Sequence, residues 1–403
     1  MELFWLEHKK LWRKKIVKIC VLLCFVYCVI FGSILSFQWF SFGSSDDYTS
    51  AFGNNFDGYT VIKDSQEYAL SFGGELTDET LQQIVSDYQQ MEADGMEKEL
   101  EKTDWQIVNS WLGTLYPELR DTSNYKTMIS YVDPDKLTGF YERRQQVLDE
   151  FLEVSGQVGA EKEYLHQIER KVEKPFHYEW VEGWSTLLGS MVADLGVVMA
   201  LFLGIVLSSL FAGEWHDNTS TLVLTTRNGW GKIALAKILT GLAFTVELFA
   251  LLAVSNVISQ LFFMGTAGWD MPIQNIKLIA VAPMNMLQAE IYEYAFVLLG
   301  AIGFAGIVMF ISAAVKNNVL TLLLSLAVVY GPMMIAEYLP YEMQKALDLI
   351  PLVGSSTDIF RTNTFRIFGK LIWSPYLLIT IPVLIGILCM PFAIKSWSRR
   401  MKA

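Results

Sequence analysis

Long apolar runs separated by shorter polar intervals dominate the chain. Six runs approach or exceed the ~20 residues that an α-helix needs to cross a bilayer, and only the third contains an acidic or basic residue, Glu247. They cover residues 19–45, 195–213, 238–264, 295–315, 317–336 and 371–394. With their flanks, they predict membrane-spanning helices at 16–37, 186–210, 233–264, 292–315, 319–339 and 372–394.

The interval between the second and third runs is charged and polar. It covers residues 211–237 and reads FAGEWHDNTSTLVLTTRNGWGKIALAK. Because it is short and bounded by two predicted spans, it predicts an amphipathic element that lies on the membrane surface.

Composition and charge support a membrane protein and set its orientation. Hydrophobic residues make up 52% of the 403 residues and the mean hydropathy is +0.33, which is unusual for a soluble protein. Basic residues crowd residues 9–18 and 395–402, so the positive-inside rule places both termini in the cytoplasm. Two cytoplasmic termini require an even number of spans, which six satisfies. Residues 1–18 also have the pattern of a basic amphipathic helix on the inner leaflet.

The segment 38–185 differs from the rest of the chain. It holds 29 acidic and 12 basic residues, and it would lie outside the cell between the first two spans. Its pattern predicts helices at 78–102, 134–154 and 160–172, with Asp133 capping the second and Pro134 in its first turn. Its expected core consists of Trp105, Ile107, Trp111, Leu112, Leu115, Phe140, Tyr141 and Leu148. The acidity favours solubility over a docking surface for cationic peptides.

The fold class is therefore an all-α membrane protein with six spans and a mainly helical extracellular domain. Residues 1–37 form the cytoplasmic helix and first span, 38–185 the extracellular domain, and 186–403 the remaining spans. The aromatic cluster at 174–185 suits the headgroup zone. Residues 265–288 form an outer loop, and 340–370 predict short helices that dip into the outer leaflet.

The sequence contains no recognisable catalytic machinery. The nearest approach to a phosphate loop ends at Gly231 and Lys232, but Thr226 occupies the position of the required glycine and Ile233 that of the Ser or Thr. The four histidines are scattered, without metal-ligand spacing. All four cysteines fall in predicted spans and behave there as small apolar residues. We expect no enzyme activity, no metal and no cofactor on this chain, and the absence of a basic face disfavours nucleic acid.

Two acidic residues in predicted spans are candidates for a transport path. Asp194 lies in the outer half of the second span and Glu247 within the third. Ionised side chains there normally face a wet pathway or a partner, although Asp194 could reach the interface and Glu247 could be protonated or hydrogen-bonded in the bundle. Gly300, Gly303 and Gly306 share one ridge of the fourth span, which indicates close helix packing.

The interval 211–237 carries a resemblance to a known family. Glu214 follows an apolar run, a Thr/Ser- and Leu-rich turn occupies 218–226, and Arg227 and Lys237 lead into the next span. This order resembles the intracellular coupling element of type-two ATP-binding-cassette (ABC) transporter permeases, in which a glutamate, a G-T-x-x-x-L-L-like segment, an arginine and a lysine follow one another. Here 218–224 stands where the family often has Gly-Thr. The six-span layout, the outer interval 340–370 and the large first outer segment, as in many Gram-positive bacterial members, resemble the family too.

The resemblance implies the membrane subunit of an ATP-driven transporter in the bacterial cell membrane, expected to export a peptide, drug or lipid-like substrate. A separate ATPase subunit would use the ATP, and the chain would pair with a second permease as a homodimer or heterodimer. The implied coupling residues are Glu214, Trp215, Thr221, Leu222, Arg227 and Lys237. Two alternatives remain open: a membrane-anchored sensor or immunity protein that captures cationic peptides, and an ion-coupled secondary transporter.

Overall fold

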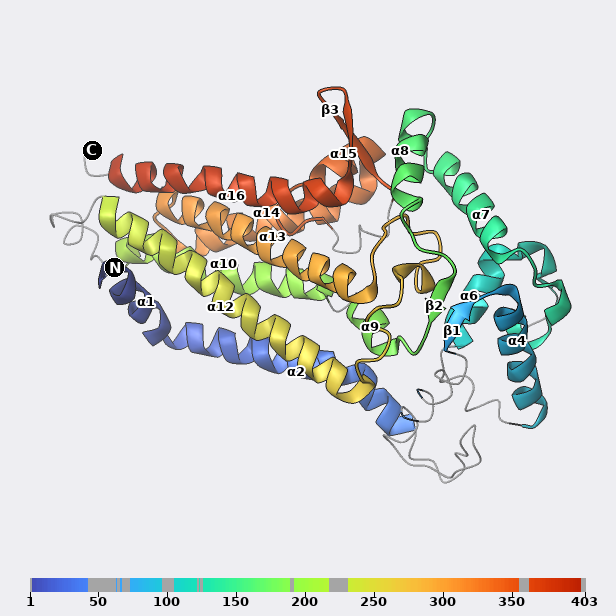
Figure 1. The fold of residues 1–403 in the computed structure, drawn as a ribbon. Helices are drawn as coiled ribbons and strands as arrows, with labels where there is room; N and C mark the ends of the chain where they lie inside the picture. Colours follow the sequence, from blue (N-terminus) through green and yellow to red (C-terminus); the bar gives the residue numbers. More distant parts are fainter. Residues whose placement is uncertain are drawn as a thin grey trace.

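The computed structural model describes residues 2–42, 63, 66, 73–95, 105–121, 123, 126–188, 192–216, 231–354 and 362–399. Long helices lie side by side in one bundle, and a smaller helical domain covers one end of it (Figure 1). Both chain termini lie at the opposite end, which we call the termini end; the end that carries the domain is the domain end.

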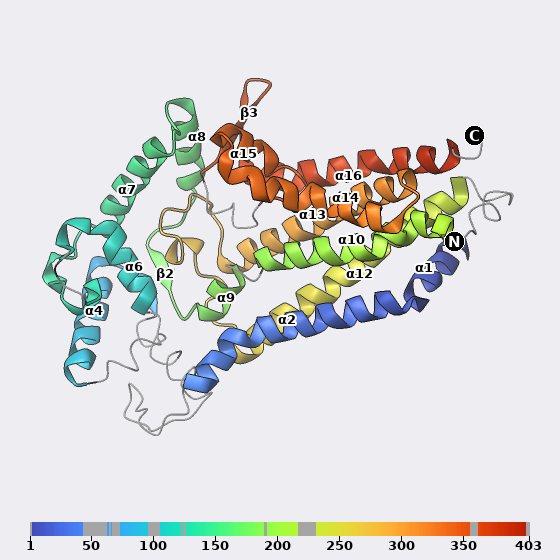
Figure 2. The same ribbon diagram turned by 180° about the vertical axis from the view of Figure 1, so that it is seen from behind.

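The bundle contains the helices that the apolar runs predict. They are α2 Lys15–Phe42, α10 Val192–His216, α12 Gly231–Met264, α13 Met286–Ala314, α14 Asn318–Ile335 and α16 Ser374–Arg399. Within the described residues, five segments are long and apolar enough to cross a membrane, namely Leu195–Trp215, Gly231–Met264, Met286–Ala314, Asn318–Tyr338 and Ser374–Ser398. The side chains of α2 are described only as far as residue 30, so the count of six spans stays a prediction. In both views α2 runs along α12 at one edge of the bundle (Figure 2).

Two of the predicted helix boundaries differ in the structure, and a helix cap explains one of them. Asn285 accepts a hydrogen bond from the backbone of Gln288, whose side chain accepts from the backbone of Asn285, and this capping box starts α13 at Met286. The helix therefore begins six residues before the predicted start at 292 and includes two glutamates, Glu290 and Glu293. The helix α10 also continues past the predicted end at 210, as far as His216.

Helices α13 and α16 touch backbone to backbone, as the glycine ridge predicts. A Cβ atom on Gly303 would meet the carbonyl oxygen of Pro382 at 2.3 Å, and one on Gly306 would meet that of Gly386 at 2.4 Å. A Cβ on Gly300 would lie 2.9 Å from Leu352 Cδ2. Only glycine permits this approach, so the ridge serves helix packing.

The domain at the far end is helical with one small sheet. Its elements are β1 Gly74–Leu76, α4 Asp78–Ala93, α6 Trp105–Leu115, η1 Pro117–Leu119, η2 Met128–Ser130, η3 Pro134–Lys136, α7 Phe140–Val154, α8 Ala160–Glu169, β2 Phe176–Tyr178 and α9 Glu182–Thr186. Strands β1 and β2 pair antiparallel, with Glu75 opposite His177. Most of the predicted core is buried: Trp111, Leu112, Leu115, Phe140 and Leu148 are at most 2% exposed. Ile107 and Tyr141 pack against that core, and the side chain of Trp105 lies outside the described part.

The predicted helix 134–154 is two elements. Asp133 does cap a turn, but this is the short η3, and α7 begins only at Phe140. Gly139 interrupts the helix with a left-handed φ of 73°, and the carboxylate of Asp78 accepts from the backbone N–H groups of Gly139 and Phe140 at 2.7 and 2.9 Å. The cap that starts α7 comes from 61 residues away, which local pattern does not reveal.

The loop 265–288 belongs to the core of this domain. Its residues Met271, Ile273, Ala280, Val281 and Ala282 are fully buried in the same apolar cluster as α6 and α7, around the short η5 Ile273–Asn275. We therefore correct the expectation of a domain inserted wholly at 38–185 beside a plain outer loop. The helical domain is completed by a segment between α12 and α13.

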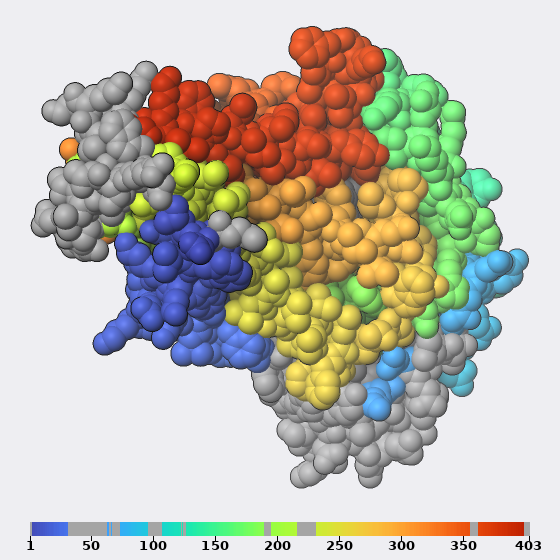
Figure 3. All heavy atoms as spheres, turned by 60° about the vertical axis from the view of Figure 1, so that its left-hand side comes forward, coloured from blue at the N-terminus to red at the C-terminus, as the bar shows by residue number. Residues whose placement is uncertain are grey.

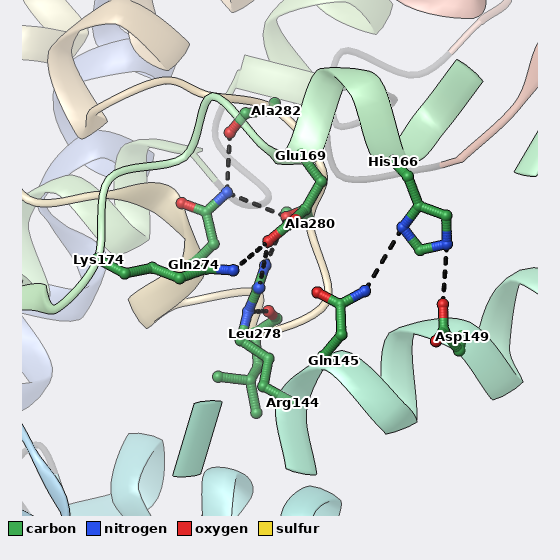
Figure 4. Close-up of polar contacts among 10 residues, drawn as sticks. All are labelled: Arg144, Gln145, Asp149, His166, Glu169, Lys174, Gln274, Leu278, Ala280 and Ala282. Carbon is green, nitrogen blue, oxygen red and sulfur yellow. Dashed lines mark hydrogen bonds and ion pairs between the residues drawn. The ribbon is translucent and has the colours of Figure 1, made fainter. Parts of the chain in front are cut away.

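Arg144 is the main polar link between this loop and the domain (Figure 4). The side chain is fully buried on α7 and donates to the carbonyls of Leu278 and Ala280, at 2.7 and 3.3 Å. Its remaining nitrogen donates to Glu169 at 2.6 Å, and Lys174 contacts the same carboxylate oxygen at 2.9 Å. One buried carboxylate is thus held by two cations.

This arrangement predicts acid sensitivity of the domain. Burial by itself would raise the pKa of Glu169, but hydrogen bonds from Lys174 and Arg144 outweigh it and the pKa lies below its ordinary value. A lowered pKa contributes stability above the unfolded-state value of about 4.3, and this contribution is lost as the pH falls through the native value. We expect the midpoint temperature of thermal unfolding, measured by tryptophan fluorescence, to decrease when the pH is lowered below about 4.3. The decrease should be less steep in Glu169→Gln. An equal slope in Glu169→Gln and in the exposed control Glu163→Gln would contradict this.

The interval 340–370 differs from the predicted short helices. Its described residues, 340–354 and 362–370, contain the short helix α15 Tyr341–Leu347, which follows η6 Ala336–Tyr338, and an antiparallel hairpin of β3 Thr364–Ile367 and β4 Lys370–Trp373. The hairpin contacts the helical domain, because Arg366 pairs with Glu161 at 2.5 Å and Thr364 donates to Gln157 at 2.9 Å. The fold is mostly helical, as predicted, and the described residues add two small two-stranded sheets.

The aromatic cluster before α10 is buried in protein. Trp180 and Trp184 are 1% and 5% exposed and donate to the carbonyls of Met264 and Thr266, at 3.0 and 3.2 Å. These two rings therefore fasten the domain to the end of α12. Their burial differs from the half-buried headgroup position that the sequence pattern predicts.

Candidate functional site

The N-terminal helix α1 Glu2–Arg13 packs against the bundle at the termini end. Figure 3 shows the first residues of the chain, in dark blue, lying against the beginning of α12. Leu11 is 2% exposed, and the ring of Trp12 meets that of Phe244 edge-on with centroids 5.7 Å apart. Trp5 and Leu6, nearer the start of α1, remain more than 60% exposed. The amphipathic helix predicted for the membrane surface therefore also has a partner within the protein.

Four charged residues from three helices meet beneath α1. Lys237 of α12 contacts Glu214 of α10 and Glu7 of α1, each at 2.8 Å. Lys10 of α1 contacts the same oxygen of Glu214 at 2.6 Å. The side chains of Lys237 and Glu214 are 2% and 4% exposed, whereas Lys10 is half exposed. We call Glu7, Lys10, Glu214 and Lys237 the ionic clamp.

The ionic clamp joins the two ends of the predicted coupling interval. Glu214 lies in the last turn of α10, where the helix dipole disfavours a negative charge by about 0.3–1 kcal/mol. Burial adds a desolvation cost of several kcal/mol per ion. Because two carboxylates and two ammonium groups meet there, the charges balance and offset these costs. A third lysine, Lys14, donates to Ser209 of α10 at 2.9 Å and extends the contact by one turn.

Glu247 faces α1 as well. Its carboxylate lies 3.1 Å from His8 Nε2 and accepts from Trp12 Nε1 at 3.0 Å. The side chain is 43% exposed, so it is half open at the seam between α1 and α12. Asp194 lies in the first turns of α10, at the domain end, and its side chain is outside the described part. A transport path through Glu247 and Asp194 stays a prediction.

Trp215 connects the clamp to the rest of the termini end. The Lys316 ammonium lies 4.5 Å from the centre of its ring, and the Trp397 ring of α16 packs edge-on at 6.1 Å. One turn earlier, the Ser312 hydroxyl of α13 accepts from the backbone of Phe211 and donates to Ser208 O at 2.7 Å. The C-terminal end of α10 is thereby fixed to α1, α12, α13 and α16.

The structure brings together only part of the predicted coupling residues. Glu214 and Lys237 form an ion pair and Trp215 lies beside it, whereas Thr221, Leu222 and Arg227 lie outside the described residues. The burial of Glu214 changes its expected role, because a side chain that is 4% exposed offers little surface to another protein.

Sequence reasoning missed the acidic partner on α1 and two glutamates on α13. The amphipathic pattern of 1–18 drew attention to its lysines, although Glu7 and Lys10 lie on one helical face at i, i+3 spacing, a signal for a paired contact. Glu290 and Glu293 have the same spacing, but they stood at a predicted boundary and were not weighed. Both are buried, at 3% and 0% exposure.

Comparison with known proteins leaves the site to be interpreted from its geometry. No family model matches the chain, and no curated protein and no solved structure is similar to it.

Proposed function

We propose that this chain is the membrane subunit of an ATP-driven transporter, resembling type-two ABC permeases, and that a separate ATPase acts on the interval 211–237. The ionic clamp carries the proposal. A buried ion pair of 2.8 Å joins the last turn of α10 to the second turn of α12, so a force on the chain between them reaches both helices together.

Glu214 serves in this proposal as a positioning residue. The clamp holds the ends of α10, α12 and α1 in fixed relation, and packed helices move as rigid bodies. The ATPase would instead bind the residues between 217 and 230, which include Arg227. A displacement of this segment by the ATPase would tilt α10 and α12 together and change access to the space beside them.

The proposal is tested by co-purification with the ATPase encoded nearest to this chain. We expect a stable complex whose ATP hydrolysis rises when the chain is added. Arg227→Ala should reduce this stimulation ~10-fold, as expected for a lost charge-assisted contact of ~1.4 kcal/mol, with an unchanged thermal midpoint. Lys18→Ala, on an exposed position of α2, is the matched control. If no ATPase binds, or if both variants stimulate like the parent, the proposal is wrong.

A membrane-anchored receptor is a second candidate, which a cavity at the helical domain favours. The cavity has a volume of about 370 Å³. It opens between the segment 171–177 and the loop 270–288, and its charged lining residues are Lys171, Glu173, His177 and Asp270. A receptor would bind a small polar or cationic part of a peptide there.

The two candidates separate by variants of this cavity. Replacing Glu173 and Asp270 by Gln and Asn should abolish ligand binding by a receptor. The same change should leave ATPase stimulation by a permease at the parental level. Binding of a labelled cationic peptide to the chain in nanodiscs, measured beside ATP hydrolysis, distinguishes the outcomes.

A further inference from the structure

Two glutamates are buried near the domain end of α13. Glu290 and Glu293 are 3% and 0% exposed, and in the described part of the chain none of their four carboxyl oxygens has a well-formed hydrogen bond, although the Tyr294 hydroxyl lies close to Glu290. The two side chains are close enough to interact electrostatically. Both lie within Met286–Ala314, a segment apolar enough to cross a membrane.

Helix α12 faces these glutamates with amide side chains. Asn256 donates to the hydroxyl of Tyr294 on α13 at 3.1 Å, and Tyr294 lies within reach of the Glu290 carboxyl. Gln260 lies one turn after Asn256, and Glu290 one turn before Tyr294. Because the two helices run antiparallel (Figure 1), this register brings Gln260 level with Glu290. Gln260 is fully buried and both of its amide atoms lack a partner among the described residues.

Basic residues are absent from the described helix segments that pack beside this end of α13. The parts of α9, α10, α12 and α16 that pack beside this end of α13 contain no Lys, Arg or His at 182–186, 192–213, 238–264 and 374–394. Besides the two glutamates, the titratable groups on these segments and on this end of α13 are Tyr292, Tyr294, Glu182, Asp194, Glu247, Tyr376 and Cys389. Cys28 of α2 lies close enough to Tyr294 to interact with it electrostatically. A carboxylate in this position without a counter-charge is costly, so it must hold a proton or a cation.

We propose that Glu290 and Glu293 form an exchangeable proton-binding site, with Tyr294, Asn256 and Gln260 as its polar surroundings. A proton is the ligand that fits, because it converts a carboxylate into a neutral acid without needing added space. A protonated carboxyl also gains a donor, which the Gln260 amide oxygen lacks in this arrangement. Separation of α12 from α13 at the domain end would expose the acid to water and release its proton.

The site is tested by infrared spectroscopy of the purified chain in lipid nanodiscs, which does not depend on an ATPase. We expect a protonated-carboxyl band at neutral pH that shifts in D₂O and disappears reversibly when the pH is raised. The band should be lost in the double variant Glu290→Gln and Glu293→Gln and kept in Glu337→Gln, an exposed glutamate at the same end of the bundle.

Three results would overturn the proposal. A band that neither exchanges in D₂O nor responds to pH would mean two inert structural acids. The absence of any band at neutral pH would mean that both groups are ionised. Loss of the band on adding sodium or methylammonium at constant pH would identify a site for those cations. Because the assay uses the chain alone, failure of the proposed ATPase partnership leaves its outcome interpretable.

Discussion

Replacing Lys237 by methionine is expected to destabilise the termini end by about 3–5 kcal/mol, the usual cost of removing one member of a buried ion pair. Methionine keeps most of the volume of the lysine stem, so the loss comes from charge. Glu214 and Glu7 would both lose their 2.8 Å contact. Among the printed contacts of Glu214, the one to the half-exposed Lys10 would remain. The clamp would then have one more carboxylate than ammonium groups, beside a Glu214 side chain that is 4% exposed. Thermal unfolding in detergent, followed by tryptophan fluorescence, measures the effect.

Two matched variants make this result specific. Lys10→Met removes the exposed ammonium and should cost only about 0–1 kcal/mol. The double variant Lys237→Met with Glu214→Gln should regain much of the stability lost in the single one, because it removes a buried charge together with its partner. If Lys237→Met is no more damaging than Lys10→Met, the pair does not hold α10 and α12 together.

The apolar pattern predicted the bundle because hydrophobic burial in a spanning helix is a local property. The helices α10, α12, α13, α14 and α16 appear where the runs place them, and Gly303 and Gly306 make the predicted close contact. The pattern was less informative about helix ends. The start of α13 depends on a capping box at Asn285, and that polar signal extends the helix into sequence that hydropathy alone assigns to a loop.

The site was predictable in part. The resemblance to a permease coupling element drew attention to Glu214 and Lys237, but it does not show that they pair with each other and with Glu7. Lys237 follows Glu214 by 23 positions and Glu7 by 230 positions in the sequence. The loop 265–288 was misjudged for the same reason. Its apolar residues fill a core whose other half is more than 100 residues away.

Replacing Arg144 by methionine is expected to detach the loop 265–288 from the helical domain. The guanidinium donates to Leu278 O, Ala280 O and Glu169. Its removal takes the described donor from Leu278 O and one of two cations from the buried Glu169, a loss of about 3–5 kcal/mol. Arg144→Lys should rescue little, because one ammonium on a flexible stem does not reproduce three contacts fixed by a planar group. Hydrogen exchange of the loop and limited proteolysis within it should both rise several-fold.

The exposed residue Arg170 provides the control for Arg144→Met. Arg170→Met removes an exposed ion pair with Glu163 and should change stability by no more than about 1 kcal/mol. Equal hydrogen exchange of the loop in Arg170→Met and Arg144→Met would contradict the role of Arg144.

If Arg144 does hold the loop, deletion of residues 38–185 would expose Met271, Ile273 and Val281, which are fully buried here. A truncated chain would then fail through aggregation whether it were a permease or a receptor. Substitutions in the cavity lining, which keep this shared core intact, are therefore the variants that separate the two functions.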